Sequence, residues 1–289
     1  MRVLIIGATG LLGSALFEEW NGERITGVGS RDVDIRDEAK LRDLYARCRP
    51  EWTVLAAAYT DVDGCEKDPG RAYEVNCTGA VKVARASREV GSRLLFVSTD
   101  YVFDGCKYAP YETDDTVNPI NVYGQSKADA ERGIREVLPH CCILRTSWLY
   151  GAKGRCFPNT LLEAAQRRKK LSVVADQTGS PTFNRDLART IIKLVRADAQ
   201  GILHASNADK CSWFEFARHI VRAAGLADVE IEPIRTEDLP RPARRPKYSV
   251  LSHTSLQRYG IHMRPWQETL DDYMSERLGM PHVRQQVAP

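Results

Sequence analysis

The sequence lacks any run of apolar residues that approaches the roughly 20 needed to span a bilayer. The stretch Met1–Ile6 has one basic residue and only a short apolar run before glycine, which is unlike an export signal. None of the eight cysteines shows CxxC or other metal-ligand spacing. Lys and Arg exceed Asp and Glu by only three charges, 41 against 38. We therefore expect a cytoplasmic protein with reduced thiols that binds neither nucleic acid nor membranes.

The 289 residues are 43% hydrophobic and 27% charged, an ordinary composition for a globular protein. Short apolar runs rich in branched residues predict buried strands at 3–6, 25–28, 52–55, 94–97 and 142–144. Between them, 37–48 and 72–90 carry apolar residues at helical spacing. This alternation predicts an α/β fold, a doubly wound parallel sheet of Rossmann type, with a dinucleotide-binding domain at 1–150.

The pattern changes after about residue 150. Proline, arginine and charge become denser, above all at 239–247, and 213–224 is predicted as an amphipathic helix. We expect 151–289 to form a smaller mixed C-terminal region that mainly binds substrate, with some segments returning to the sheet.

A glycine-rich turn, Gly7-Ala8-Thr9-Gly10-Leu11-Leu12-Gly13, follows the first predicted strand and opens a helix expected to end near Trp20. Small residues let the backbone approach a pyrophosphate, and a helix N-terminus offers it free N–H groups. The spacing is GxxGxxG, which differs from the GxGxxG dinucleotide fingerprint. We predict cofactor contacts from Gly7, Thr9, Gly10, Leu11 and Leu12; a glycine turn without a ligand is the alternative.

The end of the second strand selects the cofactor. An acidic residue there binds the ribose hydroxyls of NAD, whereas an arginine accepts the extra phosphate of NADP. Here Ser30 stands at the acidic position and Arg31 follows it. The sequence favours NADP(H), with NAD(H) also open, and the alternative for Arg31 is a solvated surface charge.

A phenol and an amine, Tyr123 and Lys127, are four residues apart and share one face of a predicted helix. A neighbouring ammonium lowers a phenol's pKa from its usual value of about 10, which makes it a better proton donor. Thr99 follows the fourth predicted strand, at the edge where α/β sheets bind ligands. We predict Thr99, Tyr123 and Lys127 as catalytic; a surface tyrosine and a capping threonine are the alternative.

Several longer segments carry a family likeness: AAAYTDVD at 56–63, STDYVFDG at 98–105, NVYGQSK at 121–127, RTSWLY at 145–150, DQTGSPT at 176–182 and the Arg245-Pro246 pair. With them the chain resembles the extended short-chain dehydrogenase/reductases, and within these the reductases of dTDP-4-dehydrorhamnose. The likeness runs from the start to about residue 250. It implies an NAD(P)H-dependent oxidoreductase that reduces the C4 keto group of a nucleotide-activated 6-deoxyhexose, with dTDP-L-rhamnose as the expected product.

The resemblance also implies individual roles. Tyr123 would protonate the sugar C4 oxygen, Lys127 would bind the nicotinamide ribose and Thr99 would hold the carbonyl. The implied cofactor residues, besides the glycine turn, are Ser30, Arg31, Asp34 and Ile35 near the adenosine, the wall Ala57, Ala58, Tyr59 and Thr60, and Tyr123 with Lys127. The implied substrate residues are Thr99, Asp100, Trp148 and Arg245. Core packing is the alternative for Trp148 and a solvated loop is the alternative for Arg245.

Other functions remain open at this point. One is a sugar-nucleotide epimerase or dehydratase, although dehydratases carry Asp-Glu after the active-site threonine and this chain has Asp100-Tyr101. Another is a non-catalytic NADP-binding subunit similar to the regulatory subunit of methionine adenosyltransferase. A homodimer and a magnesium ion at its interface, known in relatives, also stay open, and no metal ligand is assigned.

Overall fold

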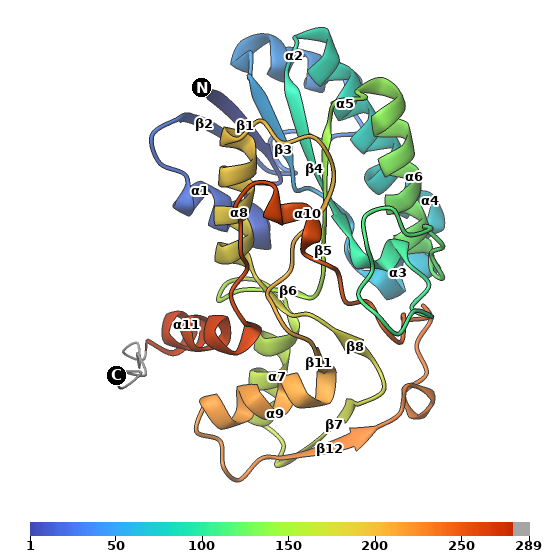
Figure 1. The fold of residues 1–289 in the computed structure, drawn as a ribbon, viewed down its shortest axis with the longest axis vertical. Helices are drawn as coiled ribbons and strands as arrows, with labels where there is room; N and C mark the ends of the chain where they lie inside the picture. The colour runs from blue at the N-terminus through green and yellow to red at the C-terminus, as the bar shows by residue number, and fades with distance from the viewer. Residues whose placement is uncertain (280–289) are drawn as a thin grey trace.

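The main sheet of the computed structural model has six parallel strands in the order β10-β5-β4-β3-β1-β2 (Figure 1). They are β1 (Arg2–Ile6), β2 (Arg24–Val28), β3 (Trp52–Leu55), β4 (Arg93–Thr99), β5 (Cys142–Thr146) and β10 (Gly201–His204). All five predicted apolar runs lie in β1 to β5, which confirms the Rossmann-type prediction. The strand order reverses beside β1, and such a reversal opens a crevice at the carboxyl edge of a sheet. The structure describes residues 1–279, so 280–289 of the predicted C-terminal region lie outside it.

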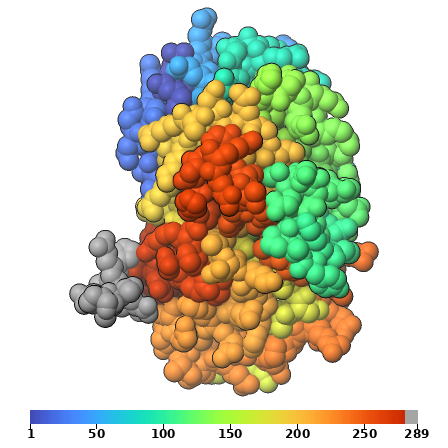
Figure 2. All heavy atoms as spheres, viewed as in Figure 1, coloured from blue at the N-terminus to red at the C-terminus, as the bar shows by residue number. Residues whose placement is uncertain are grey.

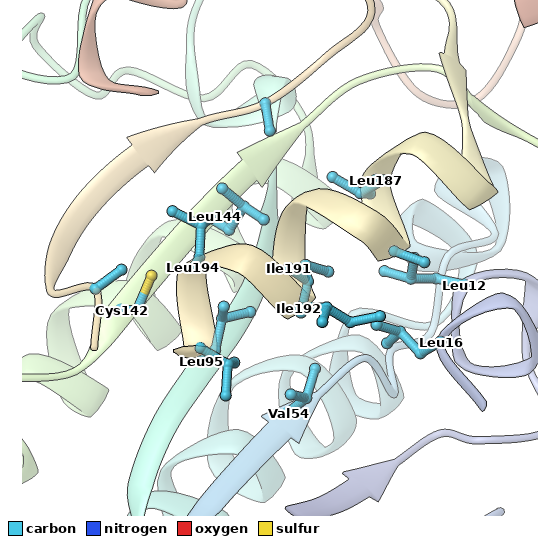
Figure 3. Packing of buried hydrophobic residues seen from close by; sticks show 14 of the residues in the cluster. Leu12, Leu16, Val54, Leu95, Cys142, Leu144, Leu187, Ile191, Ile192 and Leu194 are labelled. Carbon is cyan, nitrogen blue, oxygen red and sulfur yellow. The ribbon is translucent and has the colours of Figure 1, made fainter. Parts of the chain in front are cut away.

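Helices cover both faces of this sheet (Figure 1). Helices α1 (Leu11–Glu19) and α8 (Asn184–Arg196) pack on one face, and Figure 3 shows their Leu16 and Ile191 against Val54 and Leu95 of the strands. The other face carries α2 (Glu38–Cys48), α5 (Ala80–Glu89) and α6 (Val122–Val137). Each large apolar side chain buried in this way contributes about 1.5–3 kcal/mol. Burial on two faces explains why the strands are apolar throughout.

The segment that leads into α5 is less regular than the sequence predicts. It consists of α3 (Val62–Lys67), α4 (Pro69–Tyr73) and the π-helix η1 (Glu74–Gly79). The helix predicted at 72–90 therefore exists, with a π-helical first part. π-Helical turns often occur at functional sites, because the widened turn redirects side chains. After β4, the short helix η2 (Asp100–Val102) is capped by the Thr99 hydroxyl.

A smaller region lies below the sheet (Figures 1 and 2). Its helices are α7 (Phe157–Ala165), α9 (Trp213–Ala223), α11 (Trp266–Leu278) and η3 (Thr236–Asp238). The short helix α10 (Thr254–Gln257) packs beside β10 of the main sheet instead. Its short strands pair as β6 (Leu149–Tyr150) with β9 (Thr182–Phe183), β7 (Lys170–Val174) with β12 (Glu230–Ile234), and β8 (Thr178–Gly179) with β11 (Cys211–Ser212). Helix α9 matches the predicted amphipathic helix and begins with a Ser212–Glu215 capping box.

The chain after residue 150 contributes to the sheet layer as well as to the smaller region. Strand β10 is part of the main sheet, and α8 packs on one face of it. An aromatic cluster that includes Tyr150, Phe216 and Trp266 forms the core of the smaller region. Within residues 1–279, no helix combines the length and the apolar character needed to cross a membrane.

Candidate active site

Most of the predicted site residues line one cavity of about 770 Å³, which we call the edge cavity because it lies at the carboxyl edge of the sheet. The predicted residues in its wall are Gly7, Thr9, Gly10, Leu11, Leu12, Ser30, Asp34, Ile35, Ala57, Ala58, Tyr59, Thr60, Thr99, Asp100, Tyr123, Lys127 and Trp148. Two are elsewhere. Arg31 is exposed and lines neither this cavity nor its neighbour, whereas Arg245 lines the neighbouring cavity.

The glycine turn forms a cradle at the start of α1. Gly7 has φ +96°, and a Cβ there would lie 2.6 Å from the backbone nitrogen of Ala57. Only glycine avoids both the strain and the clash. Gly10 is the N-cap of α1 and has no side chain to accept the first N–H groups, and the first turn carries no acidic residue. This geometry fits the pyrophosphate of a nicotinamide dinucleotide.

An ion pair between Asp34 and Arg36 lines the edge cavity after the end of β2. Arg36 donates from Nε to Oδ1 of Asp34 at 3.0 Å and from Nη2 to Oδ2 at 2.7 Å, and it also contacts Glu74. These bonds lower the pKa of Asp34 to about 2, so its carboxylate is ionised. Three arginines line the edge cavity, namely Arg36, Arg71 and Arg155, and Arg31 is not among them. Of the three, Arg36 follows β2 most closely, and the sequence reasoning missed it. Its signal was a second basic residue shortly after the second strand.

Asn76 of the π-helix η1 fixes the wall of the edge cavity. Its Oδ1 accepts from the Tyr59 N–H at 2.7 Å, and its Nδ2 donates to the Tyr59 carbonyl at 3.0 Å. The same Nδ2 donates to the hydroxyl of Ser126 on α6 at 3.1 Å. Asn76 therefore ties the β3 end to α6, a role that the sequence reasoning did not assign.

The three predicted catalytic residues come together in this cavity. Thr99 ends β4, while Tyr123 and Lys127 lie one turn apart on α6. Asn121 starts that helix by accepting the Gly124 N–H at 2.7 Å. The Thr99 hydroxyl lies close enough to the Tyr123 phenol to influence the pKa of that phenol. The arrangement places a hydroxyl and a phenol side by side where a carbonyl oxygen could accept from both.

The predicted effect of Lys127 on Tyr123 is wrong for this arrangement. Burial raises the pKa of the Tyr123 phenol above its ordinary value. Lys127 is only 2% exposed, and its ammonium donates to the Val97 carbonyl at 2.7 Å and lies 3.8 Å from the centre of the Phe96 ring. Desolvation lowers the pKa of Lys127 to about 7. Burial is the largest influence on the pKa of both groups.

A buried ion pair supports α6 behind Lys127. Arg145 of β5 donates to Glu131 of α6 from Nε at 3.0 Å and from Nη2 at 2.6 Å. The two side chains are 1% and 6% exposed. Ser98 of β4 also donates to Glu131, at 2.5 Å. The pair therefore fixes the helix that carries Tyr123 against two strands.

Asp100 is buried directly behind Thr99. Its Oδ1 accepts from the Thr99 hydroxyl at 3.0 Å, while its Oδ2 has no hydrogen-bond partner within residues 1–279. Burial raises the pKa of Asp100 to about 7. A carboxyl group in this position changes its protonation state close to neutral pH.

Two stacked tryptophans close the edge cavity on the side of the smaller region. Trp148 has φ +44°, a strained value for a bulky residue, and stacks on Trp213 with ring centres 3.5 Å apart. A Cβ at Gly179 would lie 2.4 Å from the Trp148 indole, so Trp148 rests directly on that glycine. Trp148 is thus a cavity residue, and its partner Trp213, at the start of α9, was not predicted.

A second cavity of about 1,050 Å³, which we call the basic cavity, adjoins the first, and Tyr101 and Trp213 line both. Its basic residues are Arg241, Arg244, Arg245 and Lys247. Arg245 donates to Asp63 at 2.6 Å and to the Ala243 carbonyl, so it stabilises the loop as well as the cavity. Arg244 and Lys247 are more exposed. Among residues 1–279 no three metal-ligating side chains gather into a metal site.

A dinucleotide cradle that opens onto a hydroxyl, a phenol and an amine at the sheet edge defines the class. The chain is an oxidoreductase that uses a nicotinamide dinucleotide.

The comparisons with known proteins identify the family. The model of the RmlD substrate binding domain matches residues 1–278, and the chain belongs to this family. It is 40% identical over 278 residues to the spore coat polysaccharide biosynthesis protein SpsK of Bacillus subtilis, covering 96% of this chain and 98% of that protein. It is 35% identical over 263 residues to the dTDP-4-keto-6-deoxy-D-glucose reductase of Streptomyces niveus, covering 90% and 91%.

Among solved structures, the dTDP-4-dehydrorhamnose reductase of Bacillus anthracis in complex with NADP is similar, with 40% identity and a TM-score of 0.93. The match covers 95% of this chain and 99% of that one. The predictions of an extended short-chain dehydrogenase/reductase and of an NAD(P)-dependent reductase of dTDP-sugars are confirmed at the level of the family.

Proposed function

We propose that this protein reduces the C4 keto group of dTDP-4-dehydro-L-rhamnose to give dTDP-L-rhamnose, with NADPH as the hydride donor. The proposal depends on one observation: the edge cavity holds Thr99, Tyr123 and Lys127, and it shares Tyr101 and Trp213 with the basic cavity. A sugar nucleotide whose diphosphate occupies the basic cavity would have its hexose near Tyr101, next to the phenol of Tyr123. The two ring centres are 6.0 Å apart.

The catalytic step follows from the chemistry of these side chains. A reduced nicotinamide bound in the edge cavity supplies the hydride that C4 receives. Tyr123 donates its phenol proton to the C4 oxygen as negative charge develops there, and its raised pKa keeps it protonated until that moment. Thr99 donates a hydrogen bond to the same oxygen and orients the carbonyl. The charge of Lys127 stabilises the phenolate that Tyr123 becomes.

Two groups would bind the substrate outside the reacting carbonyl. Arg244 and Lys247 supply positive charge for the diphosphate, with Arg245 fixing the loop through Asp63. The Trp148–Trp213 stack offers an apolar surface at the junction for the sugar or the base.

The preference for NADPH is supported by the Arg36 guanidinium in the wall of the edge cavity. The NADP bound to the related B. anthracis enzyme supports it as well. Asp34, the ion-pair partner of Arg36, also lines this cavity and offers a carboxylate for the ribose hydroxyls of NADH. We therefore expect NADH to be accepted, as a poorer hydride donor than NADPH.

The test is a panel in which the protein meets dTDP-, GDP- and UDP-linked 4-keto sugars with NADPH or NADH. We expect rapid NADPH oxidation with dTDP-4-dehydro-L-rhamnose and an L-rhamnose product by NMR. Absence of oxidation with every keto sugar would refute the proposal. The similarity to the S. niveus reductase makes dTDP-4-keto-6-deoxy-D-glucose the second candidate substrate, and the configuration of the product separates the two.

A further inference from the structure

The hydroxyl of Thr99 has one proton, and in this structure that proton is engaged. Its oxygen accepts from the Tyr101 N–H at 3.2 Å, and its hydrogen is donated to Oδ1 of Asp100 at 3.0 Å. A threonine hydroxyl donates only once. As long as it donates to Asp100, Thr99 has no hydrogen to offer to a substrate carbonyl.

The surroundings of Asp100 suit the neutral carboxyl better than the carboxylate. The residue is 2% exposed, and within residues 1–279 no hydrogen bond is made to its Oδ2. The nearby Ser249 hydroxyl lowers the pKa of Asp100, but desolvation has the larger effect. A buried carboxylate with a bare oxygen costs several kcal/mol, whereas a neutral carboxyl has less charge to solvate. In agreement with this geometry, burial raises the pKa of Asp100 to about 7.

The titratable groups that face Asp100 carry no positive charge that would stabilise its carboxylate. They are the phenols of Tyr101 on η2 and Tyr123 on α6, and burial raises the pKa of both, so both are neutral at physiological pH. The charged groups around Tyr101 are Asp63, Arg241 and Arg245. Asp63 forms ion pairs with both Arg241 and Arg245.

We propose that Asp100 is a positioning residue whose protonated form releases the Thr99 hydroxyl proton, so that Thr99 donates to the C4 oxygen of the substrate. The proposal rests on the reduction proposed above. When Asp100 is ionised, Thr99 donates to the carboxylate, and the Thr99 oxygen is left as an acceptor for the Tyr123 phenol. Both donors then point away from the sugar. When Asp100 is protonated, both can turn to the carbonyl.

Asp100→Asn tests this, because an amide is nearly isosteric with a neutral carboxyl and cannot ionise. In the wild type, kcat should fall with rising pH, about tenfold per pH unit for each proton lost. In D100N the fall of kcat at alkaline pH should begin at a higher pH, or its slope should decrease by the amount that one proton contributes. KM should change little. The exposed Asp43→Asn, on α2, serves as the matched control and should leave the profile unchanged.

Superimposable pH profiles of the wild type and D100N would overturn the proposal, as would a folded, NADPH-binding D100N that is inactive at every pH. A second measurement needs no substrate. The infrared difference spectrum between wild type and D100N should show a protonated carboxyl band that disappears as pH rises through about 7. Absence of that band at pH 6 also contradicts the proposal. If the wild type reduces no keto sugar, the proposed function fails while the spectrum still reports on Asp100.

Discussion

Lys127 and Val97 are joined by a hydrogen bond of 2.7 Å from the lysine ammonium to a carbonyl oxygen of β4. The bond anchors the amine in the buried wall of the edge cavity, one helical turn from Tyr123. Desolvation lowers the pKa of Lys127 to about 7, so a small rise in pH removes its charge. The contribution of Lys127 to catalysis therefore depends on pH within the physiological range.

Lys127→Met should weaken NADPH binding about tenfold and slow hydride transfer about 100-fold, since a charge-assisted hydrogen bond of this kind contributes about 1.5–3 kcal/mol. Wild-type NADPH affinity should fall as pH rises through about 7, because the ammonium is then neutralised. The variant should show no such fall. Fluorescence titration and stopped-flow measurements from pH 6 to 9 check both effects, and equal pH dependence in the two proteins would contradict them.

Gly179→Ala should displace Trp148, because the added Cβ would lie 2.4 Å from the indole. Overpacking of this kind costs about 1–3 kcal/mol. We expect the Trp148–Trp213 stack to open, the tryptophan fluorescence to change and KM for the sugar nucleotide to rise about tenfold, which corresponds to about 1.4 kcal/mol. Gly70→Ala, where the nearest atom to a Cβ is 3.7 Å away, is the control. An unchanged KM in Gly179→Ala would show that the Trp148–Trp213 stack does not contribute to substrate binding.

The sequence predicted the features that depend on local pattern. The apolar runs of β1 to β5, the start of α1 at the glycine turn, and the shared helix face of Tyr123 and Lys127 follow from burial, backbone freedom and helical spacing. The edge cavity could also be anticipated, since the ends of parallel strands meet at one edge.

Features that join distant segments could not be predicted in this way. Trp213 comes from α9 and reaches Trp148 after a long intervening stretch of chain, and no local pattern marks that contact. Asn76 reaches Tyr59 and Ser126 from a π-helical turn, and the apolar spacing of this segment predicts an ordinary α-helix instead. The predicted lowering of the Tyr123 pKa was wrong because burial, which a single sequence does not show, raises the pKa of that phenol.

Glu131→Gln should lower the free energy of unfolding by about 3–5 kcal/mol, because it leaves the buried Arg145 charge without its ionic partner. The exposed Lys170–Glu232 pair gives a matched control. There Glu232→Gln should cost no more than about 1 kcal/mol. Urea unfolding of both variants measures the difference. Equal losses in the two variants would show that the buried pair contributes no more than a surface pair.

Arg36→Ala should weaken NADPH binding more than Arg31→Ala, because Arg36 lines the edge cavity and Arg31 does not. Loss of a phosphate contact costs about 1.5–3 kcal/mol, so an increase in Kd of roughly 10- to 100-fold is expected for Arg36→Ala. NADH affinity should change less. Calorimetric titration of both variants with both cofactors decides the matter, and a larger effect at Arg31 would return the phosphate site to the residue that the sequence favoured.

The central claim is that the Tyr123 phenol protonates the C4 oxygen during hydride transfer. Single-turnover NADPH oxidation by Tyr123→Phe, with dTDP-4-dehydro-L-rhamnose in excess, tests it most directly. General acid catalysis contributes about 10²–10⁴-fold, so the rate should fall by that factor while NADPH affinity stays within about twofold. A variant that oxidises NADPH at nearly the wild-type rate would contradict the account.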